Sequence, residues 1–116
     1  MHELALAQSL VTHIAEVAQR ENLARIDRVM VCVGALSGID AASLSFCFPV
    51  AARDTPAGHA RLIVREELPS GQCLNCERLS ADISPSDPRC PACGSEEILL
   101  QGGDTLRLES LEIDDV

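Results

Sequence analysis

Four cysteines in this chain have the type and spacing of metal ligands. They form two CxxC pairs, Cys73-x-x-Cys76 and Cys90-x-x-Cys93, within one short part of the sequence. Each CxxC turn can direct both of its sulfurs at one ion, and four thiolates at about 2.3 Å close a tetrahedron around zinc without leaving a position for water. A closed site of this kind stabilises structure and does not catalyse, so the four cysteines predict structural zinc.

Two other interpretations of the cysteines are weaker. A redox dithiol normally uses a single CxxC at the start of a helix in a βαβ pattern, whereas two pairs occur here in a loop-rich segment. Iron fits the same four sulfurs, and elemental analysis distinguishes it from zinc. The two remaining cysteines, Cys32 and Cys47, fall within a predicted strand and a predicted helix and are interpreted as small buried hydrophobic residues.

The amino terminus offers a different set of donors. The chain begins Met1-His2-Glu3. The α-amine, the amide nitrogen of His2 and its imidazole can form two successive chelate rings, and Ni(II) or Cu(II) prefers such a tetragonal nitrogen set. If a helix begins at once, its first amides have no acceptor within the helix, and Glu3 can add a carboxylate or its own amide. The alternative is an ordinary frayed terminus.

The amino-acid composition argues against several classes of function. The 116 residues have a formal net charge of −9, which disfavours binding to nucleic-acid phosphates. All nine basic residues are arginine, so a P-loop lysine and Schiff-base chemistry are excluded. No apolar run reaches membrane-spanning length, and no secretory signal is evident. We therefore expect a soluble, cytoplasmic protein that binds neither nucleic acid nor membrane.

The elements that must position these donors follow from periodicity. Apolar residues at steps of three and four predict a helix over residues 4–21, with Leu4, Ala7, Val11, Ile14 and Ala18 on its buried face. β-Branched residues predict a strand over 26–33. Asp40 is a candidate N-cap for a second helix, in which Leu44, Cys47, Phe48 and Ala51 share a face and Pro49 predicts a kink or an early end. Alternation predicts a strand over 60–66.

The composition changes after this strand. Residues 69–95 contain the four cysteines but few large apolar residues, so this segment cannot bury a core of its own and needs a metal. Two apolar stretches follow, residues 98–100 and 106–113. The Gly102-Gly103 pair between them predicts a tight hairpin turn.

Several of these motifs together resemble one known family. They are Met1-His2-Glu3-Leu4, Val33-Gly34-Ala35-Leu36-Ser37-Gly38, Leu44-x-Phe46-x-Phe48, the two cysteine pairs with Cys90-Pro91-x-Cys93-Gly94-Ser95, and Gly103-Asp104-x-Leu106-Arg107-Leu108-x-Ser110-Leu111. This set is similar to the HypA/HybF nickel chaperones of hydrogenase maturation over nearly the whole chain. Pro49 is a departure from what we expect in the second helix.

The resemblance implies an α+β fold. Two helices would pack on a three-stranded sheet in a nickel-binding domain of residues 1–68 and 98–116, interrupted by a zinc-ribbon-like four-cysteine domain of residues 69–97. It also implies that Met1, His2 and Glu3 bind nickel, which the protein transports, while Cys73, Cys76, Cys90 and Cys93 hold zinc. Its implied partners are a nickel-binding maturation GTPase and the [NiFe]-hydrogenase large subunit, and association of copies is possible.

Three functions therefore compete. The leading hypothesis is a metallochaperone that is not an enzyme, because an exchangeable site needs no catalytic group. A small zinc hydrolase would need an open zinc position and a general base, but all four positions are filled, and His13 and His59 are interpreted as surface residues. A zinc-ribbon adaptor that docks partners without carrying nickel is the other alternative, and it predicts that replacing His2 leaves function intact.

Overall fold

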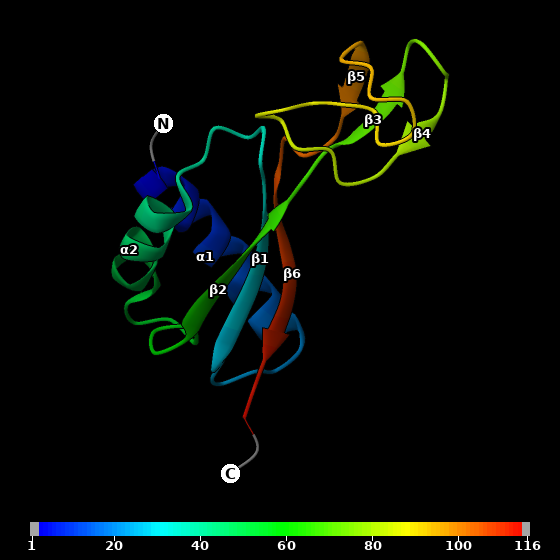
Figure 1. Ribbon diagram of the computed structural model, residues 1–116. Coiled ribbons are helices and arrows are strands. Elements are labelled where there is room, and N and C mark those ends of the chain that lie inside the picture. Colours follow the sequence, from blue (N-terminus) through cyan, green and yellow to red (C-terminus); the bar gives the residue numbers. More distant parts are fainter. Residues whose placement is uncertain (1–2, 115–116) are drawn as a thin grey trace. The chain divides into compact units, whose positions relative to one another are not determined.

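The computed structural model describes residues 3–114, and within them the chain forms two helices and six strands (Figure 1). In chain order these are α1 (Glu3–Arg20), β1 (Arg28–Gly34), α2 (Ala41–Ala52), β2 (Arg61–Glu67), β3 (Ser70–Cys73), β4 (Leu79–Ser80), β5 (Ile98–Gln101) and β6 (Leu106–Glu112). The predicted helices and the first two predicted strands all form, with ends displaced by one or two residues.

The chain divides into two compact units. The first contains the described residues up to Val31, Ile39–Arg65 and the residues from Arg107 on, and the second contains Cys32–Gly38 and Glu66–Leu106. One sheet has the strand order β2-β1-β6, and the other has the order β4-β3-β5. Among residues 3–114, neither helix is long and apolar enough to cross a bilayer. The domain boundaries at residues 69 and 97 stay a prediction.

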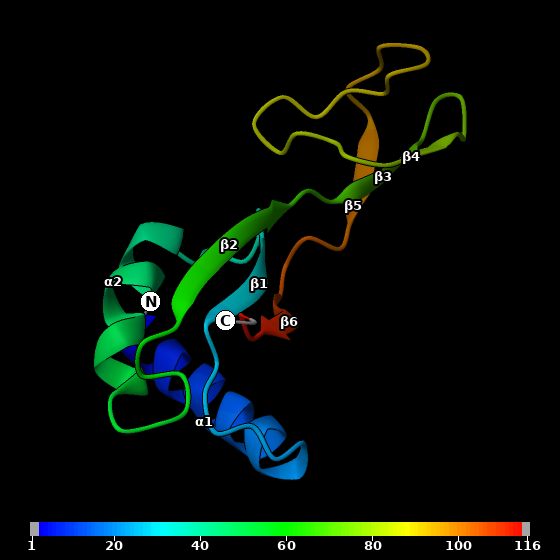
Figure 2. The ribbon, with the colours of Figure 1, turned by 90° about the horizontal axis from the view of Figure 1, so that it is seen from below.

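In the first unit, α1 packs against α2, and both helices lie on one face of the sheet β2-β1-β6 (Figures 1 and 2). The buried face of α1 consists of Ala7, Leu10, Val11, Ile14 and Ala18. The prediction that Leu4 belongs to this face is wrong, because Leu4 is 44% exposed. It lies in the first turn, where a residue has helical neighbours on one side only. Leu10 takes its place in the core.

The strand β1 supplies the centre of this core. Val29, Val31 and Val33, at alternate positions of the strand, are buried on one face. Cys32 on the opposite face is also completely buried. Burial on both faces explains why this strand is rich in β-branched residues throughout.

The helix α2 begins where the sequence predicts. The Asp40 carboxylate accepts hydrogen bonds from the amides of Ala42 and Ser43 and thereby caps the first turn. The helix does not end early at Pro49 but continues to Ala52. Proline removes the amide that would donate to the carbonyl of Ser45, and Ser45 is exposed, so water can solvate that carbonyl. Because the helix continues to Ala52, this residue joins Leu44 and Phe48 on the buried face of α2.

That buried face differs slightly from the predicted one. Leu44, Phe48 and Ala52 are at most 1% exposed, whereas Cys47 and Ala51 are only half-buried. The face is therefore rotated toward positions i, i+4 and i+8, and Ala52 replaces the two predicted residues in the core.

The predicted hairpin at Gly102-Gly103 is wrong. Both glycines have positive φ, 78° and 67°, as a tight turn requires, but the strands on either side do not pair with each other. Instead β5 pairs with β3, and β6 belongs to the other sheet, next to β1. The two glycines therefore let the chain leave one sheet and enter the next.

A close backbone contact in the second unit explains another glycine. A Cβ on Gly34 would lie 2.2 Å from the carbonyl oxygen of Gly103. The same carbonyl accepts a hydrogen bond from the Leu36 amide at 2.6 Å, and the Ala35 amide donates to Glu67 at 2.9 Å. The loop after β1 is thus held to two other segments by backbone contacts that leave no room for a side chain.

We expect Gly34→Ala to lower the free energy of unfolding by about 3 kcal/mol, because the obstructing atoms belong to backbone and cannot rotate away. Urea titration followed by circular dichroism measures the change. Gly102→Ala is the control: its Cβ meets nothing within 4 Å, so only the positive φ opposes it. That variant should lose only about 1 kcal/mol. Equal losses in the two variants would show that steric exclusion at Gly34 is unimportant.

Candidate metal centre

The four cysteines lie on two turns next to the small sheet of the second unit. In this sheet β3 pairs antiparallel with both β4 and β5, and Cys73 is the last residue of β3, opposite Ile98. In the first turn, the Cys73 amide donates a hydrogen bond to the carbonyl of Arg78. The Glu77 amide donates to the carbonyl of Cys73 and so closes the turn. The second closes similarly through the amide of Gly94, which donates to Cys90 at 2.8 Å. Each CxxC pair thus occupies a hydrogen-bonded turn.

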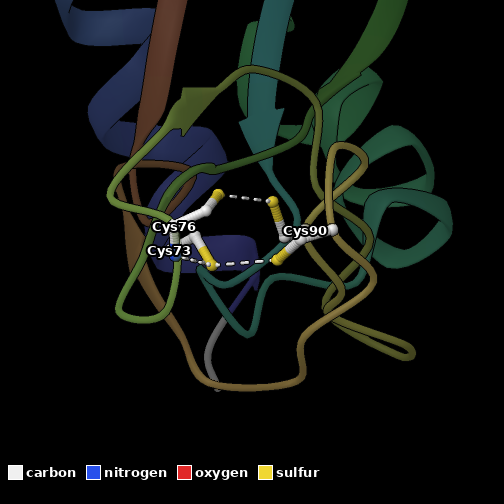
Figure 3. Close-up of side chains that lie close together, drawn as sticks. Cys73, Cys76 and Cys90 are labelled. Atoms are coloured by element: carbon white, nitrogen blue, oxygen red, sulfur yellow. Dashed lines mark hydrogen bonds between the residues drawn. The ribbon is translucent and has the colours of Figure 1, made fainter.

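The two turns bring the four sulfurs together (Figure 3). The Sγ atoms of Cys73 and Cys93 are 3.6 Å apart, and so are those of Cys76 and Cys90. All four ligand atoms lie within 4.8 Å of one another. Cys73 and Cys90 are buried, whereas Cys76 and Cys93 are exposed, so one side of the cluster faces solvent.

This spacing fits a tetrahedral thiolate site. With metal–sulfur bonds of about 2.3 Å, the sulfurs of a regular tetrahedron lie about 3.8 Å apart. The separations in this structure, 3.6 Å for two pairs and at most 4.8 Å for all, bracket that value. The cluster can therefore hold one metal ion with little rearrangement.

Backbone amides favour negative charge at the buried sulfurs. The amides of Cys76 and Asn75 each lie 3.4 Å from the Cys73 sulfur, and they lower the pKa of that thiol to about 6. The amides of Cys93 and Ala92 likewise lower the pKa of Cys90. Such amide donors are what a metal-bound thiolate needs, because they stabilise its charge.

The neighbouring sulfurs act on the Cys76 thiol in the opposite sense. At Cys76, the amide of Arg78 favours the thiolate, but the adjacent sulfurs, first that of Cys90, raise the pKa to about 11. Like charges at this distance cannot all form unaided. The cluster therefore needs a cation before all four sulfurs are ionised together.

The hydrophobic support of this cluster is small, as the sequence predicts. A Cβ on Gly71 would approach the side chains of Ile98 and Ile83 to 2.6 and 3.1 Å, so these two isoleucines fill the space beside β3. The other large apolar residues of the segment, Leu74 and Leu79, are 63% and 66% exposed. Two isoleucines provide little stabilisation, so a bound metal is the principal cross-link available here.

The predicted amino-terminal site lies partly outside the described residues, because Met1 and His2 are not among them. Glu3 is described as the first residue of α1. Its carboxylate accepts a hydrogen bond from the backbone amide of Asp40, at 3.3 Å, and so lies beside the N-cap of α2. Sequence reasoning missed this pairing, because no local pattern links residues that are 37 positions apart.

No second cluster of this kind occurs in residues 3–114, where the four cysteines are the one group of three or more metal-ligating side chains close enough to share an ion. His13 and His59 are exposed and belong to no such group, in agreement with their interpretation as surface residues.

Together, the fold and the cysteine cluster define a small α+β metal-binding protein with a zinc-ribbon-like site of four cysteines. Comparison with known proteins gives the family. Residues 1–113 match the model of the HypA family, described as hydrogenase/urease nickel incorporation metallochaperones, and the chain belongs to this family. The resemblance noted in the sequence is thereby confirmed. Members of this family are maturation factors and not catalysts.

Curated relatives and solved structures support the same family assignment. The chain is 39% identical to the hydrogenase maturation factor HybF of Morganella morganii, covering 97% of this chain and 98% of the relative. It is 33% identical to the hydrogenase maturation factor HypA of Chlorobaculum parvum, with coverages of 98% and 100%. The solution structure of the nickel metallochaperone HypA from Helicobacter pylori matches with a TM-score of 0.69 at 25% identity, covering 97% of each chain. The predicted α+β fold class is confirmed.

Proposed function

We propose that this protein binds Ni(II) at its amino terminus and delivers it during [NiFe]-hydrogenase maturation, while its four cysteines hold a structural zinc ion. The observation that carries this proposal is the family match, which begins at residue 1 and so includes Met1-His2-Glu3. The proposed acceptor is the hydrogenase large subunit, and a nickel-binding GTPase is the proposed partner in delivery. We place this process in the cytoplasm.

The proposed nickel ligands are the α-amine, the backbone nitrogens, and the imidazole of His2. Nitrogen donors in a tetragonal set suit Ni(II). The helix α1 starts at Glu3, so the amides of its first turn have no acceptor within the helix. The Glu3 carboxylate, held beside Asp40, adds negative charge at this helix end and offsets the positive end of the helix dipole near a cation.

The surface charge supports a cation as cargo. The net charge of −9 attracts cations and their complexes before any specific contact forms. The Glu3 carboxylate, at the first residue of α1 and next in sequence to His2, adds to this attraction near the proposed nickel site.

The two proposed metal sites have opposite exchange properties. An open nitrogen site at a chain end allows an acceptor's ligands to replace its donors one at a time. A four-thiolate site exchanges slowly, because every donor must be displaced from a closed shell that also stabilises the fold. Zinc would supply a folding cross-link, and nickel would be the cargo.

Metal analysis of the full chain with its native amino terminus tests this proposal. After incubation with nickel, we expect one stoichiometric zinc that survives a mild chelator and one nickel that the chelator removes. The adaptor alternative instead predicts zinc alone, and hydrogenase maturation in cells that is unaffected by His2→Ala. A zinc hydrolase would show hydrolytic turnover that depends on zinc. Absence of stoichiometric nickel at a free terminus would contradict the proposal.

A further inference from the structure

The smaller sheet has an open edge at β4. In the strand order β4-β3-β5, β4 pairs with β3 and has no second neighbour among the described strands (Figure 1). Leu79 of β4 lies opposite Gln72 of β3, and the next residue of β3, Cys73, donates its amide to the carbonyl of Arg78. Because bonded and non-bonded pairs alternate along an antiparallel ladder, the amide and carbonyl of Leu79 point away from β3. A further strand can therefore bind these two backbone groups.

A hollow of about 410 Å³ lies along this open edge. Its walls come from β4 and from the second cysteine turn, and they consist of Arg78, Leu79, Ser80, Ala81, Pro91 and Ala92. The chain turns at both ends of the edge, where Glu77 and Asp82 have φ of 66° and 57°. The hollow thus borders a short stretch, residues 78–81, that one added strand would span.

The two faces of β4 differ in their chemistry. Leu79 and Leu99 both lie opposite Gln72, so the two leucines share one face of the sheet, where they are 66% and 52% exposed. Arg78 precedes Leu79 and belongs to the other face. It is exposed and makes no ion pair within residues 3–114. A strand added to β4 would therefore meet an apolar side chain on one face and a cation on the other.

We propose that β4 binds an extended segment of a partner protein in which an apolar residue is followed by an acidic residue. The segment adds antiparallel to β4, which is the direction of both pairings already present in this sheet. Its apolar residue lies opposite Leu79, exchanges two backbone hydrogen bonds with it and packs on the leucine side chain. Because the two strands run in opposite directions, the acidic residue that follows lies opposite Arg78, beside the hollow.

Charge is the reason for choosing an acidic segment as the occupant. With a net charge of −9, most of the protein surface repels such a segment, so it can bind only where a cation offsets the repulsion. Arg78 supplies that cation, and a guanidinium group pairs with a carboxylate in bidentate geometry. A basic segment would meet a like charge there. The inference concerns the second unit alone and does not depend on nickel binding.

Nuclear magnetic resonance of the isotope-labelled, zinc-loaded full chain tests this binding. The probe is a capped peptide, acetyl-Thr-Thr-Val-Glu-Thr-Thr-amide, whose β-branched residues favour an extended strand. We expect saturable shifts of the Leu79 amide resonance and no comparable shifts in α1. The control peptide, acetyl-Thr-Thr-Glu-Val-Thr-Thr-amide, has the same composition but places its glutamate opposite Ser80. It should bind about fivefold more weakly, the upper effect of an exposed ion pair.

Two further changes separate the backbone contact from the charge contact. N-Methylation of the valine removes the donor to the Leu79 carbonyl and should weaken binding at least about tenfold. Arg78→Glu should weaken binding about fivefold, and a Val-Lys peptide should bind this variant better than it binds the wild-type chain. Arg20→Glu is the control, because Arg20 lies at the exposed end of α1, and it should leave both affinities unchanged. Zinc content and melting temperature verify that each variant is folded.

Three outcomes would overturn the proposal. The first is the absence of saturable shifts at Leu79, or equal binding of the two peptides of the same composition. The second is that the Val-Lys peptide gains nothing from Arg78→Glu, which would exclude pairing at this arginine. The third is that the same shifts appear without peptide as the protein concentration rises, which would show that a second copy of the chain occupies the edge.

Discussion

Extending the chain by even a few residues before Met1 is expected to abolish stoichiometric nickel binding, although every side chain is kept. The extension turns the α-amine into an amide, which is a far weaker donor, and it breaks the chelate that starts at the first nitrogen. We expect nickel affinity to fall at least about a hundredfold, the upper range seen on removing even an outer-shell partner. A site built from side chains alone would not respond to the extension.

Isothermal titration with nickel compares the native chain with a version that carries a short, histidine-free extension. Mass spectrometry first verifies that Met1 is retained with a free amine. His2→Ala is the companion variant: it keeps the amine but removes the imidazole, and it should also lose stoichiometric binding while its melting temperature is nearly unchanged. Equal nickel binding by the extended and native chains would eliminate the amine as a ligand.

Replacing Cys73 with Ser is expected to release zinc and unfold roughly residues 69–95. Cys73 is 1% exposed, and two backbone amides lie at 3.4 Å from its sulfur, so a serine there leaves these donors without the thiolate that they stabilise. Within this segment Ile83 is the one buried large aliphatic residue among those that the structure describes, and such a small core does not fold without its metal.

Zinc content and amide hydrogen exchange, measured in both units, test this expectation. Amides of 69–95 should lose protection, whereas those of α1 should keep it, because α1 packs with α2 in the other unit. Cys47→Ser is the matched control, since Cys47 lies in α2 outside the sulfur cluster. It should retain one zinc. A protected, metal-free segment in the Cys73→Ser variant would contradict the structural role of zinc.

Local features of the chain were predictable from the sequence. Periodicity located both helices, because the position of a side chain on a helix depends only on its place in a short repeat. Asp40 was recognisable as an N-cap, because capping involves residues two and three positions away. The cysteine pairs were recognisable for the same reason: each CxxC turn is a short-range structure, and sulfur chemistry limits its ligand.

Other features depend on residues that are far apart in the chain. The sequence suggested a hairpin at Gly102-Gly103, whereas strand pairing in the folded chain places β5 beside β3 and β6 beside β1. Pro49 suggested a kink or an early helix end, but the helix continues past it and places Ala52 in the core beside Leu44 and Phe48. Strand pairing and side-chain burial depend on the packing of the whole chain, so a short sequence pattern cannot predict them.

The sequence by itself determined the donors at both proposed metal sites, since residue type and short spacing decide which ions they suit. Only the tertiary structure decided that the sulfurs of both cysteine pairs lie within 4.8 Å of one another and that Glu3 lies against Asp40. It also left Phe46 exposed while Phe48, two residues later, is buried. The physical reason is that a distance between remote residues results from packing of the whole chain, whereas ligand chemistry belongs to each side chain alone.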